Sequence, residues 1–114
     1  MAKQNKDVKE KIEQLQLFEQ KTQALLMQKQ NFQSQLLELE NALNELENNS
    51  GQVYKIIGNI MVASEKNKLK EDLNSKTDIL ALRIKNLEKQ ENKIKEEATQ
   101  LQTEVMDELK KDGQ

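Results

Sequence analysis

The stretch "QVYKIIGNIMVAS", residues 52–64, differs from the sequence on either side of it in this 114-residue chain. It gathers β-branched and aromatic residues around Gly58 and Asn59, whereas its flanks consist mainly of Lys, Glu, Gln, Asn and Leu. Runs such as "VYKII" and "IMVA" favour strands. Because Gly occupies the first central position of a two-residue loop, a type II′ turn is favoured. The stretch therefore predicts a β-hairpin over residues 52–64.

The predicted hairpin carries apolar side chains on both faces, with Tyr54 and Ile56 on one and Val53 and Ile57 on the other. Two strands alone are marginal in water, and their open edges invite pairing with other chains. The helices are expected to bury their apolar stripes against each other, so we expect nothing else in this chain to cover the hairpin. We interpret the hairpin as an assembly module that pairs with hairpins of other subunits. A local plug that closes the helical pair is the alternative. The expected oligomerisation residues are Val53, Tyr54, Ile56, Ile57, Gly58, Ile60, Met61 and Val62.

A heptad pattern precedes the hairpin, because apolar residues recur at alternating spacings of three and four between positions 8 and 46. The apolar members are Val8, Leu15, Phe18, Leu25, Phe32, Leu36, Leu39, Leu43 and Leu46. Lys11, Thr22 and Lys29 interrupt the pattern, so we expect the half nearer the N-terminus to pack more loosely. Asp7 with Glu10 resembles a helix start, and "NNSG" at 48–51 resembles a stop, which predicts a helix over about residues 7–48.

A second heptad pattern follows the hairpin between positions 73 and 108. Its apolar members are Leu73, Leu80, Ile84, Leu87, Ile94, Ala98, Leu101 and Val105. Ser64 with Glu65 suits the start of this helix, and Lys110 with Lys111 suits its C-terminal end. The pattern predicts a helix over about residues 65–111.

Two helices of equal length with matching apolar seams are best paired antiparallel, with Val8 and Ile12 beside the region of Val105 and Leu109. A parallel coiled coil between two chains would leave the hairpin hanging between two rods. The sequence thus predicts a mainly α fold in one domain, residues 1–114. In it, one β-hairpin joins the two helices of a long antiparallel coiled-coil hairpin, and it is expected to oligomerise with other hairpins into a shared sheet or a β-barrel body.

Composition excludes most chemistry. The chain has no Cys and no His, which removes the usual zinc ligands, thiol nucleophiles and the commonest acid/base group. We find no catalytic constellation and expect no enzyme activity, cofactor or metal. Its net charge of −2, with both signs mixed, disfavours nucleic acid as a partner. Without an apolar run of about 18 residues or a signal peptide, no membrane partner is expected, and a cytoplasmic location is the expectation.

Two motifs together resemble the β-class subunit of the prefoldin family. "VYKIIGNIMV" at 53–62 is similar to the family's "VYK..G" hairpin core, and "LALRIKNLEKQENKIKE" at 80–96 is similar to its "L..R...LE.QE" second helix. The single hairpin implies the β class, because α-class subunits carry two. The resemblance implies an α2β4 hetero-hexamer with a double β-barrel body and six coiled-coil tentacles. It also implies partnership with a group II chaperonin, and unfolded proteins as clients held without ATP.

The ends of the two helices carry more apolar surface than a two-stranded seam buries. Ile12, Leu17 and Met106 lie off the strict seam, and the charged ends favour fraying. The candidate client-binding tip comprises Val8, Ile12, Leu15, Leu17, Phe18, Val105, Met106 and Leu109. For Val8, Leu15 and Val105, ordinary seam packing is an equally open interpretation. The lysines near both ends are an alternative contact for the chaperonin.

The favoured function is an ATP-independent co-chaperone subunit, a holdase that captures unfolded polypeptides at coiled-coil tips and transfers them to a group II chaperonin. The alternative is a structural coiled-coil spacer that assembles through its hairpin without binding clients. A nucleic-acid-binding coiled-coil arm is disfavoured by the acidic charge balance.

Overall fold

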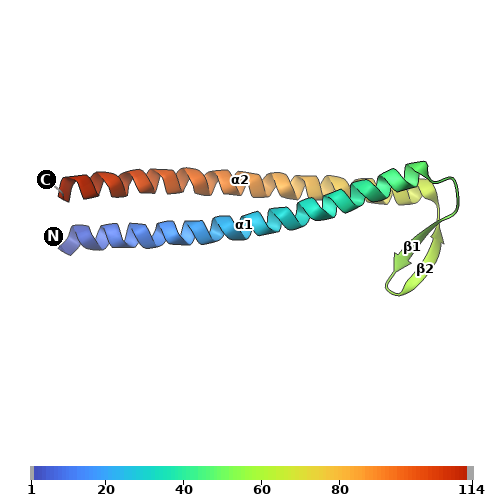
Figure 1. The fold of residues 1–114 in the computed structure, drawn as a ribbon, viewed down its shortest axis with the longest axis horizontal. Coiled ribbons are helices and arrows are strands. Elements are labelled where there is room, and N and C mark those ends of the chain that lie inside the picture. Colours follow the sequence, from blue (N-terminus) through green and yellow to red (C-terminus); the bar gives the residue numbers. More distant parts are fainter. Residues whose placement is uncertain (1, 113–114) are drawn as a thin grey trace. The chain divides into compact units, whose positions relative to one another are not determined.

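The computed structural model describes residues 2–112, with side chains described for residues 6–111. Its elements follow in the order α1 (Ala2–Asn48), β1 (Val53–Ile57), β2 (Ile60–Ser64) and α2 (Lys66–Asp112), as Figure 1 shows. The chain divides into two compact units. We call residues up to 29 together with those from 86 onward the terminal unit, and residues 30–85 the hairpin unit. The mainly α class with one β-hairpin is confirmed.

α1 begins at Ala2, about five residues earlier than the sequence suggested. Asp7 therefore lies inside the helix, and its interpretation as a cap was wrong. The physical reason is that residues 2–6 contain no Gly, Pro or β-branched residue to stop a helix. At its other end α1 stops at Asn48, where the Gly51 amide donates to Asn49 Oδ1 at 2.9 Å. This short turn redirects the chain toward β1.

α2 begins at Lys66, after Ser64 has closed the hairpin by pairing with Val53. The carbonyl of Glu65 accepts the Leu69 amide at 3.0 Å, so Glu65, rather than Ser64, occupies the position that opens the helix. Lys66 Nζ also donates to the Asn49 carbonyl at 2.8 Å. This bond ties the start of α2 to the loop that follows α1.

In the terminal unit the two helical segments run antiparallel, as their ion pairs establish. Lys11 contacts Glu104 at 3.5 Å and donates a hydrogen bond to Glu108, while Lys29 lies 3.4 Å from Glu91. A residue near the start of α1 therefore faces the end of α2, and a later residue faces an earlier one. The buried apolar side chains of this unit are Val8, Phe18, Leu87 and Val105.

The hairpin unit shows the same antiparallel packing. Glu47 pairs with Lys70 at 3.0 Å, and the Arg83 guanidinium lies 5.8 Å from the centre of the Phe32 ring. The buried apolar side chains here are Leu46, Val53, Leu80 and Ile84. The predicted antiparallel arrangement is thus confirmed within each unit.

The predicted seam is the buried seam: every predicted position of both series is buried or half-buried except Thr22. The polar members are satisfied in two ways. Thr22 and Thr77 donate back to carbonyls of their own helix at 2.9 Å. Lys11 and Lys29 instead pair with Glu108 and Glu91, which are polar positions of the opposite series. The sequence predicted the interruptions of α1, and the structure shows that two of them, Lys11 and Lys29, pair with interruptions of α2.

The two strands pair in register from Val53 opposite Ser64 to Ile57 opposite Ile60. Gly58 has φ of +61°, and no non-glycine residue in the described chain has a positive φ. Because a type I′ turn would also require positive φ at Asn59, these angles fit the predicted type II′ turn.

Candidate functional site

Three exposed apolar side chains of the terminal unit lie on one flank of the helical pair. Lys11 faces Glu104 and Glu108, which places Ile12 at the level of Met106 and Leu109. Ile12 and Leu109 occupy heptad e positions, which face each other in an antiparallel pair, and Met106 occupies the adjacent b position. Their exposed fractions are 41%, 58% and 54%. We call Ile12, Met106 and Leu109 the apolar flank.

The other predicted tip residues fall into two groups. Leu17 is 48% exposed and occupies heptad position c, on the opposite side from the apolar flank. Leu15 is half-buried, whereas Val8, Phe18 and Val105 are buried in the seam. Buried residues become available to a client only if the helices separate. Client binding by all eight residues stays a prediction.

The terminal unit holds charges where a coiled coil normally holds apolar residues. The hydrogen bond to Glu108, helped by the charge of Glu104, raises the pKa of Lys11. Buried oxygens of Glu91 and Glu108 have no hydrogen-bond partner, and Glu91 relies on the ion pair with Lys29. Such arrangements are weak sources of stability because charges lose hydration on burial. This seam is therefore poorly suited to tight packing.

A groove of about 420 Å³ opens beside this polar stretch of seam. Leu15 and Phe18 line it together with two short side chains, those of Thr22 and Ala98. Glu91 also lines it. The terminal unit thus combines exposed apolar residues with a groove beside its charged seam positions.

The hairpin presents most of its apolar residues to solvent. Val53 is buried at 8% exposure, so the expectation that nothing in the chain could cover the hairpin was wrong at this position. The physical reason is that Val53 shares a groove with Leu46, Leu69 and Leu73 of the helices. All other predicted assembly residues with large apolar side chains are exposed, namely Tyr54, Ile56, Ile57, Ile60, Met61 and Val62.

The register decides which of these residues share a face. Ile56 lies opposite Met61, so both share one face of the hairpin with Tyr54. That trio lines an open groove of about 630 Å³ together with side chains from α1 and α2. Lys55 anchors the hairpin to α2 through an ion pair with Asp72 at 3.8 Å. An exposed apolar sheet with two open edges is a candidate assembly surface.

Five exposed apolar residues in the helices were not among the predicted site residues. They are Leu26, Met27, Leu37, Ile79 and Leu82. Each lies outside the heptad seam, so inspection of off-seam apolar positions along both helices, rather than near the tips alone, would have found them.

Within residues 2–112, no group of three or more Asp and Glu residues could hold a metal ion. No helix in the same described range is long and apolar enough to cross a bilayer. The fold and its surfaces therefore define a class: a coiled-coil hairpin subunit with an exposed apolar surface in each unit.

Comparison with known proteins narrows that class. The sequence model of the family described as "Prefoldin subunit" matches residues 9–112. Prefoldin subunit beta of Methanococcoides burtonii is 35% identical, covering 94% of this chain and 93% of its own. That of Caldivirga maquilingensis is 30% identical, covering 86% and 83%. The crystal structure of the prefoldin beta subunit from Thermococcus strain KS-1 is similar, with a TM-score of 0.85, 32% identity and coverage of 89% and 90%.

The chain belongs to the prefoldin subunit family, and its likeness is to beta subunits. Prefoldin is a chaperone family, not a known enzyme family, and its subunits assemble into hetero-oligomers. Membership implies a co-chaperone role.

Proposed function

We propose that this chain is a subunit of an ATP-independent holdase that captures unfolded polypeptides with its terminal unit and transfers them to a group II chaperonin. The observation that carries the proposal is the apolar flank. Ile12, Met106 and Leu109 stay exposed at one level, on one side of the helical pair. Such a surface suits non-native chains, which expose apolar side chains without a fixed shape.

The physics of the terminal unit suits weak and adaptable binding. Met106 is flexible and polarizable, so it fits many apolar partners. Separation of the helices would add Val8, Phe18 and Val105 to the available surface, and the charged seam lowers the cost of that separation. Several such units on one assembly would hold a client together although each binds weakly.

Assembly is proposed to run through the hairpin. Its exposed faces and unpaired edges fit the addition of strands from neighbouring subunits. We propose that α-class subunits complete an α2β4 hexamer whose body is a double β-barrel. Cytoplasm is the proposed location.

The holdase proposal is tested with the triple variant Ile12→Ser/Met106→Ser/Leu109→Ser. The control is Met27→Ser/Leu82→Ser, because these residues are at least as exposed but lie on outer helix faces. We expect the assembled triple variant to lose most suppression of aggregation of a guanidinium-denatured enzyme, measured by light scattering. The control should suppress like wild type. Full suppression by the triple variant would refute client binding by this flank.

The assembly proposal is tested with Ile56→Asp/Ile60→Asp against the control Met27→Asp/Leu82→Asp. Size-exclusion chromatography with light scattering should show a hexamer when wild type or control is mixed with an α-class subunit. The hairpin variant should remain unassembled, because a carboxylate on each strand cannot be buried in a shared sheet. A hexamer formed by the hairpin variant would refute the barrel.

The second candidate function is that of a structural coiled-coil spacer. The Leu-rich seam of the hairpin unit favours it, because such a seam can keep the two helices rigidly paired without binding clients. It predicts that the wild-type hexamer forms but leaves client aggregation unchanged. Delivery to a chaperonin is tested separately, by the recovery of client activity when a group II chaperonin and ATP are added.

A further inference from the structure

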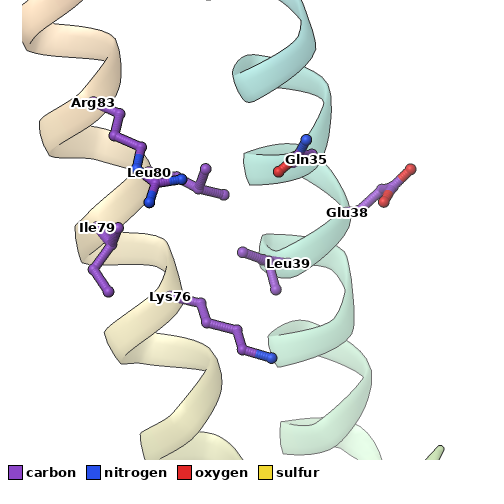
Figure 2. A pocket seen from close by; sticks show the side chains of 7 residues that line it. All are labelled: Gln35, Glu38, Leu39, Lys76, Ile79, Leu80 and Arg83. Carbon is purple, nitrogen blue, oxygen red and sulfur yellow. The ribbon is translucent and has the colours of Figure 1, made fainter. Parts of the chain in front are cut away.

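A groove of about 450 Å³ lies on one side of the helical pair in the hairpin unit. Figure 2 shows the side chains that line it, which are Gln35, Glu38 and Leu39 of α1 and Lys76, Ile79, Leu80 and Arg83 of α2. Leu80 is buried and Leu39 half-buried, so they form the floor. Ile79 is 51% exposed. The groove therefore has an apolar floor, an exposed aliphatic side chain and two cations.

The two cations are not neutralised. Within residues 6–111, no carboxylate lies within ion-pair distance of Lys76 or Arg83, and neither side chain donates a hydrogen bond. Neighbouring lysines differ, since Lys55 and Lys70 both have carboxylate partners. The one carboxylate that lines the groove, that of Glu38, points away from α2 in Figure 2.

Arg83 is already oriented for binding. Its guanidinium lies 5.8 Å from the centre of the Phe32 ring, close enough for a cation–π contact. A contact with a ring face uses no N–H group, so the guanidinium keeps its donors for a carboxylate, which it can bind through two parallel hydrogen bonds. An oriented side chain also loses less freedom on binding.

The spacing of these side chains specifies the shape of a partner. Lys76 and Arg83 are seven residues apart, which is about 10.5 Å along a helix, and Ile79 lies between them. A helix with two carboxylates seven residues apart and an aliphatic side chain between them has the complementary pattern on one face. Helices that pack against a groove of this kind present such faces at three- and four-residue intervals.

We propose that this groove binds an acidic amphipathic helix of a partner protein. One carboxylate pairs with Arg83, the other with Lys76, and the aliphatic residue between them packs on Ile79. The inference goes beyond the proposed function, because it assigns a second protein-binding surface, in the hairpin unit, with charge selectivity that the apolar flank lacks.

The experiment uses the whole 114-residue chain. The probe is a fluorescent helical peptide of about 16 residues, or a little over four turns, with two Glu seven apart and Leu between them. Binding is measured by fluorescence anisotropy. The control peptide carries Gln for both Glu. We expect the control peptide to bind about tenfold more weakly than the acidic peptide. Raising the salt concentration should weaken binding of the acidic peptide.

The matched protein variants are Lys76→Gln/Arg83→Gln in the groove and Lys85→Gln/Lys89→Gln outside it, which remove the same charge. The groove variant should bind the acidic peptide about tenfold more weakly, and the outside variant like wild type. Equal loss in both variants would show a general charge effect and overturn the proposal. So would equal binding of the Glu and Gln peptides.

Three further measurements distinguish loss of binding from loss of folding and separate this proposal from the holdase proposal. Because Arg83 also contacts Phe32, circular dichroism checks that the groove variant is folded. If it is not, amide shifts of wild type decide instead: the peptide should move signals of residues 32–39 and 76–83, and shifts confined to other residues would overturn the proposal. The Ile12→Ser/Met106→Ser/Leu109→Ser variant should bind the peptide normally, so failure of the holdase proposal leaves this one standing.

Discussion

The two units build the same antiparallel helical pair from different seams. In the hairpin unit, α1 contributes Phe32, Leu36, Leu39, Leu43 and Leu46 without interruption, and Thr77 alone interrupts the predicted series of α2. In the terminal unit, Lys11 faces Glu108 and Lys29 faces Glu91 across the seam. One heptad pattern can therefore form a rigid seam in one region and a seam that adjusts in another, depending on which seam positions are charged.

The largest expected difference comes from truncating a seam leucine in each unit. Leu80→Ala in the hairpin unit removes a buried side chain and should lower the free energy of unfolding by about 3 kcal/mol. Leu101→Ala in the terminal unit removes a half-buried one and should cost about 1.5 kcal/mol. Urea denaturation followed by circular dichroism measures both. Equal losses would show that the two seams are packed alike.

Replacing charged seam positions of the terminal unit with apolar residues should raise its stability toward that of the hairpin unit. The double variant Lys29→Leu/Glu91→Leu replaces a poorly hydrated ion pair with packing and should raise the free energy of unfolding by about 1–2 kcal/mol. Lys29→Leu alone leaves the Glu91 carboxylate without its partner and should be less stable than the double variant by at least about 1 kcal/mol.

Amide hydrogen exchange locates the effect of that double variant. Protection should rise in residues 6–28 and 88–111 and change little in residues 30–48. A double variant less stable than wild type would mean that the ion pair contributes net stability, and the contrast between the seams would be lost.

A substitution in the turn of the hairpin should lower stability without changing the terminal unit. Gly58→Ala should lower the free energy of unfolding by about 1 kcal/mol because φ is +61° there, while the added Cβ would meet no atom within 4 Å. Gly51→Ala is the matched control, with no positive φ and its Cβ 3.4 Å from Asn49 Oδ1, and should change stability by less than about 0.5 kcal/mol. Urea titrations compare the two. If Gly58→Ala altered amide hydrogen exchange in the terminal unit, the effect would not be local.

The smallest expected effect is a pH dependence of the terminal unit. Because the bond to Glu108 raises the pKa of Lys11 above its ordinary value of 10.5, folding favours the protonated amine. The contribution is fully present below the unfolded pKa and is lost as pH rises through the folded pKa. Melting temperatures of wild type and Lys11→Met, measured between about pH 9 and about pH 12, should therefore converge as pH rises. A constant difference would argue against the linkage.

Much of the fold was predictable because heptad spacing and turn chemistry are local signals. The seam positions, the antiparallel helices and Gly58 in its turn follow from residue order alone. The helix start was not predictable in the same way. Asp7 resembles a cap by residue type, yet the residues before it also favour a helix, so the helix continues to Ala2.

The candidate surfaces were predictable only in part. Off-seam apolar residues such as Ile12 and Met106 could be named from sequence, because a two-stranded seam leaves those positions outside. Burial of Val53 could not, since it depends on how the hairpin folds against Leu46 and Leu69. Nor could the absence of a carboxylate partner for Arg83 among residues 6–111, because it depends on where the nearby carboxylates lie in the folded chain.

Residue order was enough to predict two heptad helices, a glycine-centred hairpin between them and the polar interruptions of the seam, because each depends on residues a few positions apart. The folded chain was needed to find that Lys11 meets Glu108 and Lys29 meets Glu91, and that Lys76 and Arg83 border a groove without carboxylate partners among residues 6–111. The physical reason is that charge pairing acts over a few ångströms between residues far apart in the chain, so it is fixed only once the register of the two helices is set.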